Sequence, residues 1–139
     1  MKIDDYLKKK LVNGLKDCAK KTLEETDLRK RAFYLAQCNE DAAIVMKLNY
    51  DSELVLLQFA LEISSRTIAS RIETIISAEN ETIPLPENLF EKIVKILTEL
   101  ATKIESDEKT HESIEKLMEL AYVTTPSGYS QLMKGQIKI

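Results

Sequence analysis

Residues 51–80 constrain this chain most strongly, because they contain neither glycine nor proline and are apolar around most of the circumference of a helix. One apolar set recurs at three- and four-residue steps, and a second set widens the apolar surface. The first set is Leu54, Leu57, Leu61, Ile68, Ile72 and Ile75, and the second is Leu56, Phe59, Ala60 and Ile63. Asp51 or Ser52 is suited to cap the start of such a helix, and Glu53 lies in its first turn. The spacing therefore predicts one long central helix that is packed on several sides.

Further helices are predicted at residues 3–25, 28–48 and 87–105. A last helix is predicted to follow a turn at residues 106–110 and to end at residue 122, and the alternative is one unbroken helix, because that turn contains neither glycine nor proline. Gly14 in the first helix either permits close packing or marks a bend, and Asn39 is a candidate interruption of the second. The 139 residues fit one domain with a single core. We expect an all-α bundle of about five helices over residues 1–123.

Residues 124–139 differ in character, with turn residues at Pro126, Ser127 and Gly128 and again at Lys134 and Gly135. Residues 129–133 and 136–139 are predicted to form a small β-hairpin. An isolated hairpin is marginal in water, so we expect this tail to dock on the helices or on a partner.

The charge of the chain is unevenly placed along the sequence. Residues 1–31 hold ten Lys or Arg and six Asp or Glu, a balance of +4, and the remainder holds ten and seventeen, a balance of −7. This asymmetry fits a solvated helix face, attraction to an acidic partner or a phosphate backbone, or complementary packing between subunits. No apolar segment has the length of a signal peptide or a membrane span, which predicts a soluble, cytoplasmic protein without membrane partners.

The chemistry required of an enzyme is missing from the sequence. Glu108 and His111 have the Glu-x-x-His spacing of di-iron bundles, but His111 is the only histidine, so the second copy that such a site needs does not exist. Cys18 and Cys38 are too few for a disulfide framework or a zinc site, and they lack a neighbouring histidine in sequence. No glycine-rich phosphate loop or nucleophile turn occurs. The sequence predicts a protein that is not an enzyme and has no metal or cofactor.

Two segments, LEISSRTIASRIETIISAENETIPLPENLFEKIVKILTEL and GYSQLMKGQIKI, resemble archaeal subunits of the GINS replication complex. The resemblance covers residues 54–139 and is to the type with a helical domain first and a small β domain last. It implies a non-enzymatic scaffold that forms an oligomer with a paralogous subunit and joins the replicative helicase to a RecJ-like protein, with DNA contacted weakly. The last sixteen residues are too few for a complete β domain, so the tail would be a reduced module.

The site residues expected from this resemblance form an assembly interface on the central helix. They are Leu57, Leu61, Glu62, Ser65, Arg66 and Ser70. Glu62 and Arg66 are spaced for an i,i+4 ion pair.

The alternative is a small helical nucleic-acid-binding subunit of a ribonucleoprotein effector complex of the CRISPR type. Its phosphate contacts would come from basic residues near the N-terminus, namely Lys8, Lys9, Lys10, Lys16, Lys20, Arg29, Lys30 and Arg31. Such binding would weaken steeply with salt.

Overall fold

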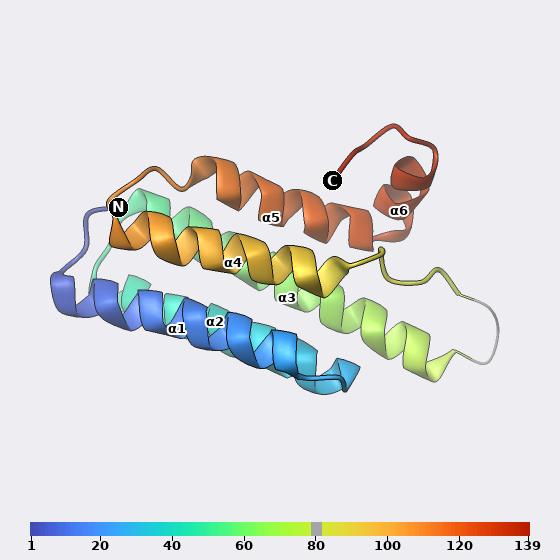
Figure 1. The fold of residues 1–139 in the computed structure, drawn as a ribbon, viewed down its shortest axis with the longest axis horizontal. Coiled ribbons are helices and arrows are strands. Elements are labelled where there is room, and N and C mark those ends of the chain that lie inside the picture. The colour runs from blue at the N-terminus through green and yellow to red at the C-terminus, as the bar shows by residue number, and fades with distance from the viewer. Residues whose placement is uncertain (79–81) are drawn as a thin grey trace.

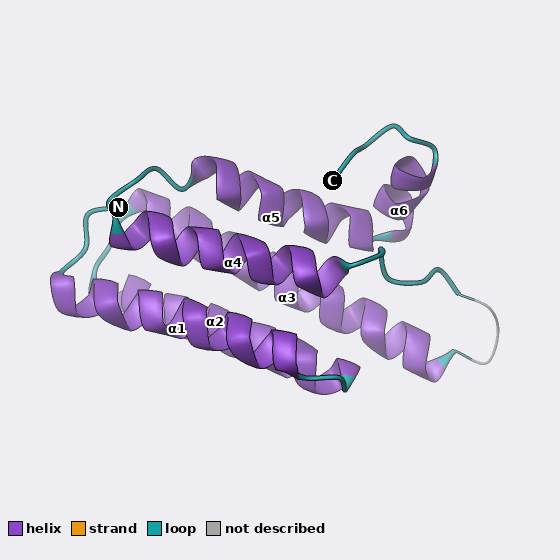
Figure 2. Ribbon diagram, viewed as in Figure 1, coloured by secondary structure: helices purple, strands orange, loops and turns teal. Residues whose placement is uncertain are grey.

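The computed structural model describes residues 1–78 and 82–139, and those residues form six α-helices (Figures 1 and 2). The helices are α1 (Asp5–Glu24), α2 (Leu28–Leu48), α3 (Ser52–Ser77), α4 (Leu89–Glu105), α5 (His111–Thr124) and α6 (Pro126–Met133). No strand occurs in the described part of the chain. The all-α class is confirmed.

The first five helices run side by side along the molecule (Figure 1), and their mutual contacts close a ring around the core. α1 packs against α2 and α4, α2 packs against α3, and α5 closes the ring between α3 and α4. α3 is the longest helix, with 26 residues, and extends beyond α1 and α2 at one end of the bundle. α6 packs against α5.

Aspartates begin the first three helices. Asp4 accepts hydrogen bonds from the backbone N–H groups at the start of α1, Asp27 accepts one from Arg29 N, and Asp51 accepts one from Leu54 N at 3.0 Å. These bonds satisfy N–H groups that have no partner inside the helix. The predicted start of the central helix is confirmed, whereas its predicted last residues, 79 and 80, lie outside the described part of the chain.

One hydrophobic core fills the middle of the ring. Its largest fully buried side chains come from every helix of the ring, and they are Leu11, Leu15, Val45, Leu54, Leu57, Ile68, Ile72, Ile93, Leu97, Leu100, Ile104 and Leu117. Each helix of the ring contributes an apolar face to this one shared interior.

Close packing of α1 on α2 explains the glycine within α1. A Cβ atom on Gly14 would lie 3.0 Å from the Asp41 carboxylate of α2. The expected interruption of α2 at Asn39 does not occur, because the helix is continuous and the Asn39 side chain accepts a hydrogen bond from Gln58 Nε2 at 2.9 Å.

The predicted β-hairpin of the tail is wrong. Residues 126–133 form α6 instead. Thr125 Oγ1 caps this helix by accepting a hydrogen bond from Gly128 N at 3.1 Å, and Pro126 occupies the first turn, where its fixed φ suits a helix. The turn residues that indicated a hairpin therefore start a helix.

Candidate interaction surfaces

The predicted assembly residues on α3 divide between the interior and the surface. Leu57, Leu61 and Ser65 are only 0%, 3% and 5% exposed. Their side chains contact the other helices of this chain, so they are not available to a partner in the folded protein. The assembly interface itself stays a prediction.

Glu62, Arg66 and Ser70 remain on or near the surface of α3. The expected ion pair forms, with Arg66 Nη2 2.9 Å from Glu62 Oε1. The Arg66 side chain is 79% exposed, so water screens the pair and its contribution to stability is a few tenths of a kcal/mol, about 0.3–0.5.

A second apolar stripe on α3 points away from the core. Leu56 and Phe59 are 46% and 51% exposed, and Ile63 on the same side is half-buried. We call these three residues the outer stripe. Their spacing of three and four residues was visible in the sequence, but both apolar stripes of α3 share that spacing, so it did not indicate which one faces solvent.

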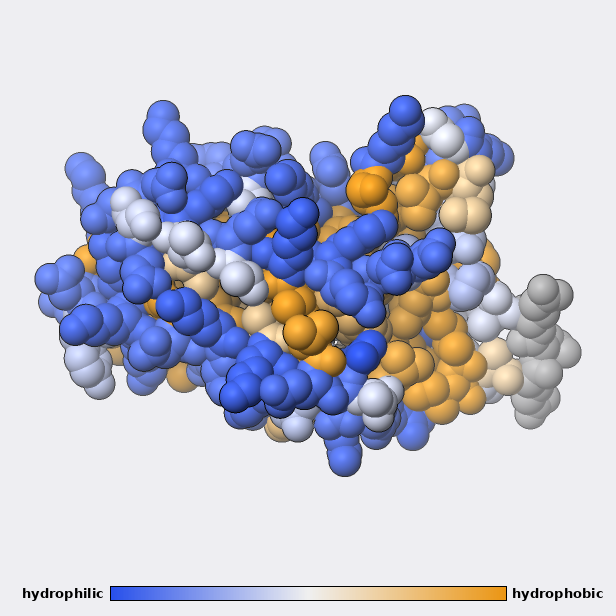
Figure 3. Space-filling model, in the orientation of Figure 1, coloured by the Kyte–Doolittle hydropathy of each residue, from blue (hydrophilic) through white to orange (hydrophobic). Residues whose placement is uncertain are grey.

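The surface seen in Figure 3 is mostly hydrophilic over α1 and becomes hydrophobic toward the end where α3 extends past α1 and α2. Ile76, in the last turn of α3, is 44% exposed. Uncovered apolar side chains therefore occur in both the first and the last part of α3.

The basic N-terminal segment is joined to acidic residues elsewhere in the same chain. Lys16 Nζ lies 3.0 Å from a carboxylate oxygen of Glu105 and Arg29 Nε lies 2.7 Å from one of Glu73, while Lys8 pairs with Asp107. These pairs tie α1 to the end of α4 and α2 to α3. Part of the positive charge near the N-terminus is therefore used in ion pairs between helices of this same chain.

The other predicted phosphate-binding residues are placed differently. The Arg31 guanidinium donates to the backbone oxygen of Glu25 and lies over the Phe90 ring, 4.7 Å from its centroid. The four remaining lysines are exposed on α1 and α2, and they are Lys9, Lys10, Lys20 and Lys30. Phosphate binding by these residues stays a prediction.

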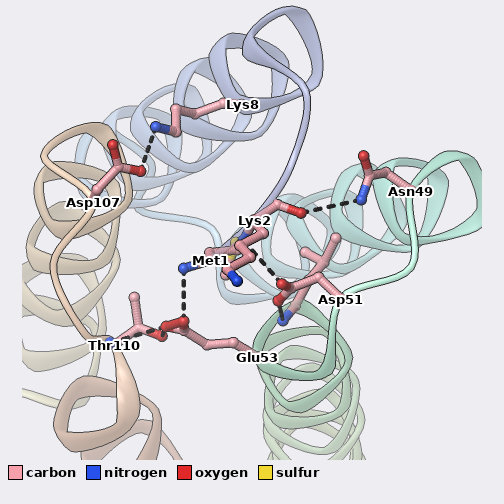
Figure 4. Close-up of polar contacts among 9 residues, drawn as sticks. Met1, Lys2, Lys8, Asn49, Asp51, Glu53, Asp107 and Thr110 are labelled. Atoms are coloured by element: carbon pink, nitrogen blue, oxygen red, sulfur yellow. Dashed lines mark hydrogen bonds and ion pairs between the residues drawn. The ribbon is translucent and has the colours of Figure 1, made fainter.

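Glu53 connects three distant parts of the chain (Figure 4). Its carboxylate accepts hydrogen bonds from Thr110 Oγ1 at 2.6 Å and Thr110 N at 3.2 Å, and it lies 3.0 Å from the amino group of Met1. Beside it, Asp51 accepts a hydrogen bond from Lys2 N at 2.9 Å. This cluster fastens the N-terminal segment and the α4–α5 turn to the start of α3.

The pKa of Glu53 reflects these contacts. Burial raises the pKa of this carboxyl, but the hydrogen bonds from Thr110 and the charge of the Met1 amino group outweigh burial and lower it below the ordinary value. A lowered pKa in the folded state means that the ionised carboxylate stabilises the fold above about pH 4.5. This stabilisation is lost as the pH falls through the folded-state pKa.

We expect Glu53→Gln to lower the free energy of unfolding at about pH 7 by roughly 1.5–3 kcal/mol, the contribution of hydrogen bonds to a charged group. Urea denaturation at about pH 7 and pH 3 measures the effect, which should shrink at the lower pH because pH 3 lies below the ordinary Glu pKa of 4.5, so that the unfolded chain is protonated at this residue. Glu115→Gln, a change to an exposed carboxylate on α5, is the control and should have little effect at either pH. Equal losses for the two variants would contradict the role of Glu53.

The two cysteines come together although they are distant in sequence. Cys18 of α1 and Cys38 of α2 both line a cavity of about 190 Å³, and they are 5% and 1% exposed. Cys18 Sγ donates to the backbone oxygen of Tyr34 at 3.2 Å. A hydrogen bond with Cys18, together with burial, raises the pKa of Cys38 well above its ordinary range. The Cys38 thiol is therefore a poor nucleophile, because little thiolate is present.

Because both side chains are buried, we expect neither cysteine to react with a water-soluble maleimide at about pH 7 while the protein is folded, whereas both react in denaturant. Mass spectrometry over time counts the modified thiols. Rapid labelling of Cys38 in native buffer would show that α1 and α2 separate readily.

His111 lies exposed in the first turn of α5, and no group of three or more His, Cys, Asp or Glu in the described residues is arranged to hold a metal ion. None of the helices described is long and apolar enough to cross a bilayer. Comparison with protein-family models, with curated proteins and with solved structures finds no match for this chain.

Proposed function

We propose that this chain is a non-enzymatic subunit that binds an α-helix of a partner protein through the outer stripe of α3. The observation that carries this proposal is the exposure of Leu56 and Phe59, two large apolar side chains, beside Ile63 in the first half of the longest helix. Single exposed apolar residues are ordinary on protein surfaces, but a row of them along one helix face is typical of an interface.

The spacing of the outer stripe favours a helix as the partner element. Residues 52, 56, 59, 63, 66 and 70 recur at alternating steps of four and three, the spacing at which two helices pack side by side. Within this row the three apolar residues are flanked by polar ones, Ser52, Arg66 and Ser70. An apolar centre with a polar border is the usual composition of a protein interface.

Burial of the outer stripe would supply a useful part of the binding energy. Complete burial of a Leu, Ile or Phe side chain contributes about 1.5–3 kcal/mol, and only part of this remains to be gained, because Leu56 and Phe59 start roughly half exposed and Ile63 starts less exposed than either. The gain must exceed the entropy lost on association, so additional contacts are needed. Ile44 and Leu48 in the last turns of α2 are 44% and 66% exposed and lie close to the start of α3 in the chain.

The specific assembly that we propose is a DNA replication complex of the GINS type, with a paralogous subunit supplying the partner helix. A long helix, a proline-containing loop and a second amphipathic helix, α4, support this proposal because they carry the larger part of the resemblance. The tail gives it no support, since residues 126–133 are helical. Contacts with the replicative helicase and a RecJ-like protein belong to the same proposal.

Light scattering over a dilution series tests the proposal, with the chain alone, mixed with a GINS-type paralogous subunit, and in about 1 M NaCl. An apolar interface should persist in salt, where exposed ion pairs are screened. We expect Phe59→Glu to weaken the complex by about 30-fold or more, as expected for a central interface residue.

Phe33→Glu is the matched control, because Phe33 is 58% exposed on α2 and lies outside the stripe. Circular dichroism should show both variants folded. An assembly that forms equally well with Phe59→Glu, or a chain that stays monomeric both alone and with the paralogous subunit, would overturn the proposal.

A further inference from the structure

A cavity lies between α4, α5 and the segment after α6, which turns back over α5 (Figure 1). Its volume of about 410 Å³ is within the range of small-molecule sites. Ile96 of α4 and Leu120 of α5, which are 6% and 3% exposed, form its floor, and Ile139 lines it from the C-terminal segment. The cavity therefore has an aliphatic base.

The rim of this cavity is positively charged. It carries four lysines and two glutamates, which are Lys92, Lys95, Lys116, Lys138, Glu99 and Glu119. Counted over side chains, four positive and two negative charges give a local balance of +2, whereas the side chains of the whole chain sum to −3. The rim of the cavity is therefore positively charged, although the chain as a whole is acidic.

Most of this positive charge is not neutralised by close ion pairs. Lys116 pairs at 3.5 Å with Glu112, which lies outside the cavity lining. Within the described residues, Lys92, Lys95 and Lys138 have no carboxylate oxygen within 4.0 Å. An anion placed between these ammonium groups would be attracted by all of them and would reduce their mutual repulsion.

We propose that this cavity binds a small amphipathic anion, namely an aliphatic chain that ends in a carboxylate or phosphate group. The aliphatic part would lie on Ile96, Leu120 and Ile139, and the anionic group would lie among the rim lysines. No aromatic side chain lines the cavity, so its lining favours an aliphatic body over a ring that must stack. Lysine ammonium groups bind carboxylate and phosphate alike as point charges.

The ring topology creates this site from separate parts of the chain. The short turn at residues 106–110 makes α4 and α5 antiparallel neighbours, which places Ile96 opposite Leu120. α6 then redirects the chain, so that Lys138 and Ile139 reach the same cavity. Periodicity along one helix cannot indicate a site of this kind.

Isothermal titration calorimetry with four probes tests the proposal. The two amphipathic anions are kept below the concentrations at which they form micelles. Octanoate and octyl phosphate carry both parts of the ligand, acetate carries only the charge, and octanol carries only the chain. We expect saturable binding of octanoate or octyl phosphate that is about tenfold tighter than binding of acetate or octanol. Preference for octanoate would indicate a free fatty acid as the source, and preference for octyl phosphate a phosphorylated lipid.

The double variant Lys95→Glu and Lys138→Glu should weaken this binding about tenfold or more, because it reverses two rim charges without breaking a close ion pair. Lys109→Glu, at the exposed α4–α5 turn outside the cavity, is the matched control and should bind as the wild type does. Absence of saturable binding by both amphipathic anions, equal affinity for octanol, or unchanged affinity in the double variant would each overturn the proposal.

Discussion

Replacement of Leu57 by alanine is expected to lower the free energy of unfolding by about 2–5 kcal/mol, the range for removing a fully buried leucine side chain. Leu57 is 0% exposed and lies in the part of α3 that faces the interior of the ring. The loss has two parts. Fewer apolar atoms are removed from water when the variant folds, and the missing atoms leave a cavity that the surrounding helices cannot fill. Urea denaturation with a linear extrapolation measures it.

The neighbouring residue provides the control for this prediction. Leu56 is 46% exposed on the outer stripe, so Leu56→Ala should change the free energy of unfolding by no more than about 0.5 kcal/mol. The same substitution should instead weaken partner binding. If Leu56→Ala proved the more destabilising of the two, the result would contradict the burial of Leu57 in the core and the exposure of Leu56 on the outer stripe.

Replacement of Gly128 by alanine is expected to displace α6 from α5 and to cost about 1–3 kcal/mol, the range for overpacking. A Cβ atom on Gly128 would lie 1.9 Å from the backbone oxygen of Tyr122 and 2.8 Å from Val123 Cα. Both are backbone atoms of α5, so a side-chain rotation cannot relieve the clash. Only a movement of the two helices apart can do so.

Hydrogen exchange locates this effect. Amide protection should fall in α6 and persist in α1 to α4, because α6 packs only against α5 among the described helices. Ser130→Ala, at an exposed position of α6, should keep that protection and serves as the control. Full protection of α6 in Gly128→Ala would contradict the close approach of the two helices. Displacement of α6 should also weaken anion binding, since the segment after it lines the cavity.

Local signals in the sequence explain what was predicted correctly. The helix at residues 28–48 was predicted with the bounds that the structure has, because Asp27 caps its start and an apolar face runs through it. The error in the tail also has a local cause. Thr125 followed by Pro126 is a helix start as well as a turn signal, and the hairpin interpretation used only the second meaning.

Long-range arrangement explains what the sequence did not reveal. Nothing near Glu53 in sequence indicates that its carboxylate binds Thr110, which lies 57 residues further along the chain. Likewise, the distance between Cys18 and Cys38 in sequence gave no sign that both would line one small cavity. Such contacts depend on which helices become neighbours when the ring closes.

The sequence by itself determined the all-α class, the single core and the approximate limits of the helices, because periodicity, capping and the absence of glycine and proline act over a few residues. Only the tertiary structure decided which apolar stripe of α3 is buried. Leu57 and Leu61 lie inside the ring while Leu56 and Phe59 face outward, although all four are apolar and helical. Burial is a property of the neighbours that surround a side chain, and those neighbours come from helices that are far apart along the chain.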